Sequence, residues 1–200
     1  MVADGPAAPT GAEDADDLVD RGDEGTRRAP VLFIDADACP VTREAIACAR
    51  SVGVPCVVCG DSGHNLTRHV RPGDPTDPED ARGGFWVRVL SVPAGPDSAD
   101  FAIVSELEEH DVVVTQDMGL ASMALGRGCA AIDVRGRVFD RRTIDALLLV
   151  RHATKAELRS RRRRGRPDVG RHEPFSADDR ERFQRRLHQL LLEARAATRG

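Results

Sequence analysis

The sequence lacks any long hydrophobic segment. No uncharged apolar run reaches about 18 residues, the length that a helix needs to cross a bilayer, anywhere in the 200 residues. The first thirty residues also lack the hydrophobic centre of a secretory signal peptide. These absences argue against a helical membrane protein, and we expect a soluble protein of the cytoplasm with no membrane partner.

The sequence also lacks the cysteine pattern of a disulfide framework or a zinc site. Cys56 and Cys59 have the spacing of a metal or redox pair, but no second pair completes a zinc site. Both lie in an apolar, strand-like run, whose alternation points the two thiols to opposite faces. We therefore expect reduced, buried thiols at all five cysteines, which are Cys39, Cys48, Cys56, Cys59 and Cys129.

Charge is distributed unevenly along the chain. Residues 1–29 carry a net charge of −5, residues 30–150 carry −7 and residues 151–200 carry +8. The first segment has few large apolar side chains, which predicts a disordered acidic tail. Seven arginines between residues 159 and 171 predict a basic linker over residues 153–175. Such a run is compatible with a solvated connection and with contacts to nucleic-acid phosphates.

Apolar runs alternate with amphipathic segments in the acidic body of the chain. This alternation predicts an α/β domain over residues 30–152, with a mainly parallel central sheet and helices on both faces. Gly, Pro and Asp residues predict a long surface loop over residues 60–84. A C-terminal amphipathic helix is expected within residues 176–200. The expected strands are 31–34, 54–59, 85–92, 112–117 and 129–134, and the expected helices are 40–52, 97–109, 120–125, 141–150 and 177–197.

Acidic residues follow two of the expected strands. Asp35 and Asp37 end the first apolar run, and Thr115 and Asp117 end the fourth. Ligands bind at the carboxyl ends of the strands in open α/β sheets. This edge is therefore the first place to look for chemistry.

Two further aspartates open the expected helix over residues 97–109. Asp97 can be explained as an N-cap and Asp100 as a first-turn acid that complements the helix dipole. Their spacing of three residues also places both carboxylates on one helical face, as a metal site would need. The phenyl ring of Phe101 is expected in the buried stripe of the same helix.

Gathering Asp35, Asp97, Asp100 and Asp117 at one edge would be costly without a cation. Two carboxylates about 5 Å apart repel by roughly 3 kcal/mol at an effective dielectric constant of 20. Clusters of oxygen ligands suit Mg²⁺ or Mn²⁺, which activate water for phosphodiester cleavage. His64 and His69 lie in the loop; both are typical of solvated residues, and His64 is the better candidate for a ligand or substrate contact.

Four motifs stand out, at residues 33–40, at residues 114–122, at Arg135-Gly136, and at Phe175 with residues 179–183. They resemble the YaiI/YqxD family of bacterial proteins, which is largely uncharacterised and is similar to PIN-like metal-dependent nucleases. The resemblance implies a three-layer α/β domain in which Asp35, Asp97, Asp100 and Asp117 bind metal and catalyse hydrolysis of RNA, or less favourably DNA. It further implies supporting or substrate-binding roles for Asp37, Thr115 and Arg135, with Arg135 on a phosphate.

Two other interpretations compete with a nuclease. A haloacid-dehalogenase-type phosphatase also has Asp-x-Asp after a buried strand, with the first Asp as nucleophile. That pattern continues with Thr or Val where this chain has Cys39, and it uses a lysine, whereas the only lysine here is Lys155. The second alternative is a non-catalytic RNA-binding or interaction module, in which the carboxylates are satisfied by helix N–H groups or arginines.

Overall fold

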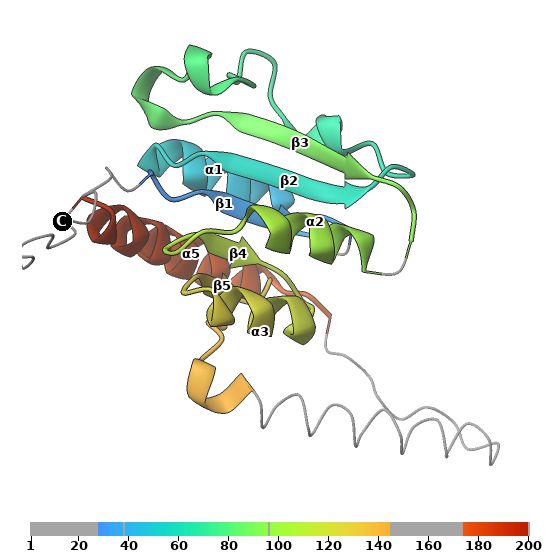
Figure 1. Ribbon diagram of the computed structural model, residues 1–200, viewed down its shortest axis with the longest axis vertical. Helices are drawn as coiled ribbons and strands as arrows, with labels where there is room; N and C mark the ends of the chain where they lie inside the picture. The colour runs from blue at the N-terminus through green and yellow to red at the C-terminus, as the bar shows by residue number, and fades with distance from the viewer. Residues whose placement is uncertain (1–27, 38, 96, 145–173, 200) are drawn as a thin grey trace, which may run out of the picture.

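A five-stranded parallel sheet forms the centre of the protein (Figure 1). The computed structural model describes residues 28–37, 39–95, 97–144 and 174–199. The strand order is β3-β2-β1-β4-β5, and every neighbouring pair is parallel. The strands are β1 (Leu32–Asp35), β2 (Cys56–Asp61), β3 (Val87–Val92), β4 (Val112–Val114) and β5 (Ala130–Ile132). The predicted α/β class with a parallel sheet is confirmed.

Helices cover both faces of the sheet and bury two separate apolar layers. On one face, α1 and α5 pack over β1, β2 and β4; on the other, α2 and α3 do so (Figure 1). The helices are α1 (Thr42–Val52), α2 (Ser98–Glu106), α3 (Met118–Gly126) and α5 (Ala177–Ala197), with short 3₁₀ helices η1 (Leu66–His69), η2 (Pro78–Asp80) and η3 (Arg82–Gly84). Cys56 belongs to the first layer and Cys59 to the second, which confirms that these thiols lie on opposite faces.

Most elements lie where the sequence places them, and the larger differences in their ends have reasons in the tertiary structure. The strand expected over residues 112–117 ends at Val114, because Asp117 already caps α3. The expected loop over residues 60–84 starts later, because Gly60 and Asp61 continue β2 and pair with Ser91 and Val92. Helix α2 ends at Glu106 rather than at residue 109, because Leu107 turns into extended backbone and is buried under the second layer. The expected helix over residues 141–150 is helical at residues 141–144, and its remainder lies outside the described residues.

None of the described helices is long and apolar enough to cross a bilayer. The basic linker expected over residues 153–175 lies outside the described residues except for its last two, and the expected acidic tail lies outside them except for Arg28 and Ala29.

Arg28 closes a buried polar junction at the amino-terminal edge of the sheet. Its guanidinium donates to both carboxylate oxygens of Asp111, at 3.1 and 2.6 Å. The Asp111 side chain is fully buried and also accepts hydrogen bonds from the N–H groups of Val31 and Glu108, each at 2.8 Å. Burial raises the pKa of Asp111, and Arg28 and the two N–H groups counter that effect. The junction ties the start of β1 to the loop before β4.

Replacing Arg28 with Gln should lower the free energy of unfolding by about 2 kcal/mol, because a buried carboxylate loses its counter-charge. Urea denaturation at pH 7 measures the change. Arg142→Gln removes an exposed arginine that has no described ion pair and should change stability little.

Deletion of residues 1–27, which leaves Arg28 in place, is the second control. It should also leave stability nearly unchanged, since these residues carry few large apolar side chains. Equal stability of the Arg28→Gln and Arg142→Gln variants would contradict the assigned role of the junction.

Candidate functional site

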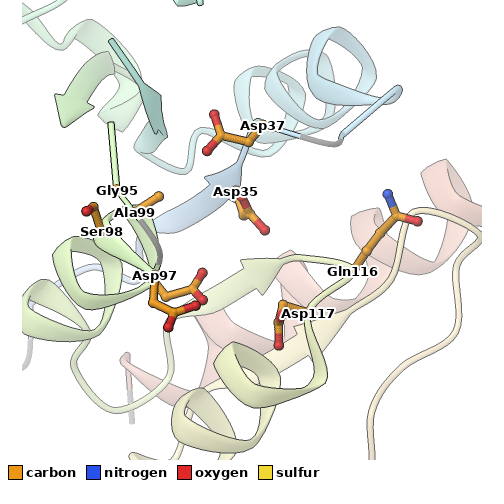
Figure 2. Close-up of a pocket in the computed structure, with 9 residues that line it drawn as sticks. Asp35, Asp37, Gly95, Asp97, Ser98, Ala99, Gln116 and Asp117 are labelled. Atoms are coloured by element: carbon orange, nitrogen blue, oxygen red, sulfur yellow. The ribbon is translucent and has the colours of Figure 1, made fainter. Parts of the chain in front are cut away.

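A cavity of about 340 Å³ opens at the carboxyl ends of β1 and β4, beside the first turn of α2 (Figure 2). Side chains from these three elements and from the segments that follow the strands form its wall. The residues that line it are Asp35, Asp37, Gly95, Asp97, Ser98, Ala99, Asp100, Gln116 and Asp117. The structure therefore brings together all five aspartates that the sequence singled out, from segments up to 82 residues apart in the chain.

Thr115 connects the two strands that carry the first and last acids. Its hydroxyl donates to Oδ2 of Asp35 at 2.8 Å and accepts from the N–H of Asp117 at 2.9 Å. The Thr115 residue is only 1% exposed, so this hydroxyl has no competition from bulk water. Asp117 begins α3, and its Oδ1 accepts from the N–H of Gly119 at 2.5 Å. Each of Asp35 and Asp117 thus has one oxygen fixed by a neighbour.

Asp97 occupies the N-cap position of α2, but its side chain makes no capping hydrogen bond. Its backbone is left-handed, with φ of 59° and ψ of 10°, a conformation that costs energy for a residue other than glycine. The explanation of Asp97 as an N-cap therefore holds for its position and not for its carboxylate. Figure 2 shows that carboxylate facing the space bounded by Asp35 and Asp117.

Asp100 is the aspartate on which the charge of the cluster acts most. Burial and the negative charges of Asp35, Asp117, Asp97 and Asp37 raise its pKa to about 6. The pKa of Asp35 is raised mainly by burial, and the Thr115 hydrogen bond opposes the rise. The pKa of this carboxyl is thus raised first by burial and then by its acidic neighbours.

Asp37 is tethered to the end of β2. Its Oδ1 accepts from the N–H of Asp61 at 2.7 Å and lies 3.7 Å from Nδ1 of His64, whose side chain is 55% exposed. Gly60 allows this approach, because a Cβ at that position would lie 2.6 Å from the same oxygen. His64 contacts the acidic cluster only through Asp37, and it does not line the cavity.

The structure does not bring Arg135 into the cavity. Its guanidinium forms an ion pair with Asp179 in the first turn of α5 and lies 5.9 Å from the ring centre of Phe175. Gly136 lets α5 approach closely, because a Cβ there would lie 2.8 Å from the backbone nitrogen of Phe183. In this structure the Arg135-Gly136 motif docks the C-terminal helix.

Sequence reasoning missed the exposure of Phe101. This side chain was expected in the buried stripe of α2, yet it is 67% exposed and directly follows Asp100. Ile103 and Leu107 provide the buried contacts of this segment instead. The apolar pattern alone gives no signal for this, because α2 is apolar on several sides.

The donor set fits a hard divalent cation, although it is not gathered around one point. Among the described residues, no three His, Cys, Asp or Glu side chains stand close enough to hold one ion as they are placed. The five carboxylates surround the cavity, and no lysine or arginine is among its described lining residues to neutralise them. Mg²⁺ and Mn²⁺ prefer carboxylate oxygens and keep several waters, so a cavity of this size and chemistry suits them.

Asp100→Asn should stabilise the cation-free protein at pH 7.5 and not at pH 3.5. A raised carboxyl pKa means that the folded state holds its proton more tightly than the unfolded chain does. Stability from this group is therefore full below the unfolded value near 4 and is lost as the pH rises through about 6. Because the side chain is partly exposed, the gain at pH 7.5 should be no more than about 1 kcal/mol.

Thermal melts in chelator at the two pH values measure this difference. Asp80→Asn, at an exposed position outside the cavity, is the control and should show no such pH dependence. A loss of stability in Asp100→Asn at pH 7.5 would mean that the carboxylate is held by favourable contacts instead.

The chain is similar to a group of bacterial proteins. The family model described as "Uncharacterized BCR, YaiI/YqxD family" matches residues 79–193. A UPF0178 protein of Clostridium acetobutylicum is 30% identical over 161 residues, which cover 80% of this chain and 96% of that protein. UPF0178 proteins of Bacillus thuringiensis and Halalkalibacterium halodurans are 31% and 32% identical over 160 residues, or 80% of this chain, and are covered to 97% and 89%. No solved structure matches the chain.

Proposed function

The chain belongs to the YaiI/YqxD family, and we propose that it is a divalent-metal-dependent nuclease that hydrolyses phosphodiester bonds in RNA or DNA. The observation that carries the proposal is the set of five aspartates around one cavity whose described lining includes no basic side chain. A bound Mg²⁺ or Mn²⁺ would supply Lewis-acid chemistry and a more acidic water to the phosphodiester. Asp35, Asp97, Asp100 and Asp117 are the residues that would hold the cation.

The hydrogen bonds in the site argue against a purely structural use of the acids. If the carboxylates only capped helices or paired with arginines, each would be satisfied within the protein. Thr115, Gly119 and Asp61 each donate to one oxygen of Asp35, Asp117 and Asp37, and Asp35 also receives a backbone hydrogen bond from Asp37. Asp97 makes no capping bond, and the charges around Asp100 are all negative. This arrangement fixes the orientation of the acids and leaves oxygens for a cation.

Single-stranded RNA is the substrate that the surroundings favour over DNA duplex. Exposed aromatic rings stack on unpaired bases, and Phe101 presents such a ring one residue after Asp100. A phosphatase of the haloacid-dehalogenase type is less well supported, because no lysine is among the described residues that line the cavity. A non-catalytic RNA-binding module would share the surface and lack hydrolysis.

Asp35→Asn and Asp117→Asn should each reduce Mn²⁺-dependent cleavage of a single-stranded RNA oligonucleotide by about two orders of magnitude, because each removes a charge that holds the cation. Asn keeps an oxygen that can accept the bond from Thr115 or cap α3, so both variants should fold. Gel analysis of end-labelled RNA measures cleavage, with Asp80→Asn as the control.

Thermal melts provide a readout besides activity. Mn²⁺ should raise the melting temperature of the wild type and of Asp80→Asn by mass action, and should do so much less for the two site variants. In chelator the site variants should be at least as stable as the wild type, since a repulsive charge is gone. Similar loss of stability in chelator and in Mn²⁺ would overturn the metal site and the nuclease with it.

A further inference from the structure

A second cavity, of about 330 Å³, lies on the outer side of α1 and has the opposite charge. Four arginines line it, namely Arg43, Arg50, Arg68 and Arg71, together with His69. No acidic residue is among its described lining residues. The segments that form it follow β1, which ends at Asp35, and β2, whose last residue Asp61 donates to Asp37.

The 3₁₀ helix η1 connects this basic cavity with the acidic one. Leu66 begins η1 and is buried against Gly60, at the position where Asp37 approaches β2. Three and five residues later, His69 and Arg71 line the basic cavity. Arg43 lies in the first turn of α1, and its guanidinium reaches the carbonyl of Arg68 at 3.4 Å. The basic cavity is thus built from α1 and the segment after β2, and η1 links that segment to the position of Asp37.

One wall of the basic cavity is fixed in place by Arg50. Its guanidinium forms a two-point ion pair with Asp74, at 2.9 and 2.5 Å, and stacks 5.0 Å from the ring centre of Phe85. Asp74 also accepts from the backbone N–H of Arg71 at 3.0 Å. This arrangement holds the segment that carries Arg71 against α1. Arg50 is therefore neutralised and structural, and the free charge of the cavity comes from the other three arginines.

The other three arginines are less completely neutralised than Arg50, although the charge of Asp74, which Arg50 already pairs, also acts on Arg71. None of Arg43, Arg68 and Arg71 forms a salt bridge with another described residue, and all three side chains are exposed. Guanidinium groups match the geometry of phosphate oxygens and bind them through paired N–H donors. Three of them around one cavity form a cluster that repels itself unless an anion is present.

His69, in the wall of the cavity, carries a buried hydrogen-bond donor that has no partner among the described residues. Nε of Arg68 donates to Nε2 of His69 at 3.1 Å, and a guanidinium can only donate. The neutral ring must therefore carry its proton on Nδ1. That atom is buried and has no hydrogen-bond partner among the described residues, so it is a donor without an acceptor. Burial and the charges of Arg68 and Arg43 lower the pKa of His69, which keeps the ring in this neutral form.

We propose that the basic cavity binds a phosphate group of the nucleic acid whose cleavage is assigned to the acidic cavity. The identity of the strand rests on the proposed function, whereas the preference for phosphate rests on the cavity itself. Arg43, Arg68 and Arg71 contact the phosphate oxygens, and His69 lies beside Arg68 in the same wall. The bound phosphate belongs to the backbone beside the scissile bond or to the end of the strand, and it places the strand across the acidic cavity.

The test compares binding with cleavage in the full chain. A 3′-fluorescein-labelled single-stranded RNA of mixed sequence is titrated in chelator, and fluorescence anisotropy is followed over a series of salt concentrations. The variant Arg43→Gln/Arg68→Gln/Arg71→Gln should bind more weakly, and the slope of log affinity against log salt should fall by about 0.7 for each phosphate that the variant no longer neutralises. The control Arg142→Gln/Arg185→Gln/Arg186→Gln removes three exposed charges elsewhere and should keep the wild-type slope.

Two outcomes separate the phosphate site from the proposed function. If the wild type binds RNA through the three arginines but does not cleave it in Mn²⁺, the nuclease assignment fails and the phosphate site stands. If both triple variants bind and cleave like the wild type, the phosphate site fails and the nuclease stands. Thermal melts of both variants confirm that they remain folded.

The source of the phosphate is resolved by three competitors, namely inorganic phosphate, a 5′-phosphorylated RNA and the same RNA with a 5′-hydroxyl group. Stronger competition by the 5′-phosphorylated strand assigns the cavity to a strand end, and equal competition by the two strands assigns it to the backbone. The ring signals of His69 in NMR spectra should shift on titration with inorganic phosphate in the wild type and stay in place in the triple variant. Unchanged signals in the wild type would overturn the site.

Discussion

The parallel pairing of β1 with β2 on one side and with β4 on the other is the constraint on which both sites depend. Parallel strands all end at the same edge, so the chain leaves the sheet there three times along these neighbouring strands. The segments after β1 and β4 deliver Asp35 and Asp117 to that edge, and Thr115 bonds them together. The loops after β1 and β2 supply the basic cavity. Topology therefore gathers residues that are far apart in sequence.

The chemistry of that edge follows from a balance between attraction to backbone donors and repulsion between acids. One oxygen of Asp35, Asp37 and Asp117 is satisfied by a nearby hydroxyl or N–H group, which fixes where these carboxylates stand. Burial and the remaining repulsion between the acids raise the pKa of Asp100 to about 6. This repulsion destabilises the folded protein until a cation or a proton binds to the acids. The arginines of the basic cavity repel one another, and a bound anion would reduce that repulsion. A metal-bound phosphodiester strand would reduce the repulsion in both cavities.

Sequence alone predicted the sheet and most helices because apolar runs and Gly or Pro boundaries report local structure directly. It also found the five aspartates, since they follow apolar runs or open a helix. It could not predict that Asp97 adopts a left-handed backbone or that Phe101 is exposed, because both depend on how α2 sits against the sheet. The basic cavity was missed for the same reason: Arg43 and Arg68 are 25 residues apart, and only the fold brings them together.

The motifs shared with the YaiI/YqxD family divide into two physical roles. Residues around Asp35 and Asp117 form the acidic cavity, whereas Arg135, Gly136 and Asp179 dock α5. The docked helix α5 acts on the basic cavity through α1, against which it packs. Helix α5 buries Phe183, Leu187 and Leu191 against α1 and the sheet, and Arg195 donates to the carbonyl of Val52 at the end of α1. Because α1 carries Arg43, Ile46 and Arg50, the C-terminal helix supports the element that lines the basic cavity and that follows the segment of Asp37.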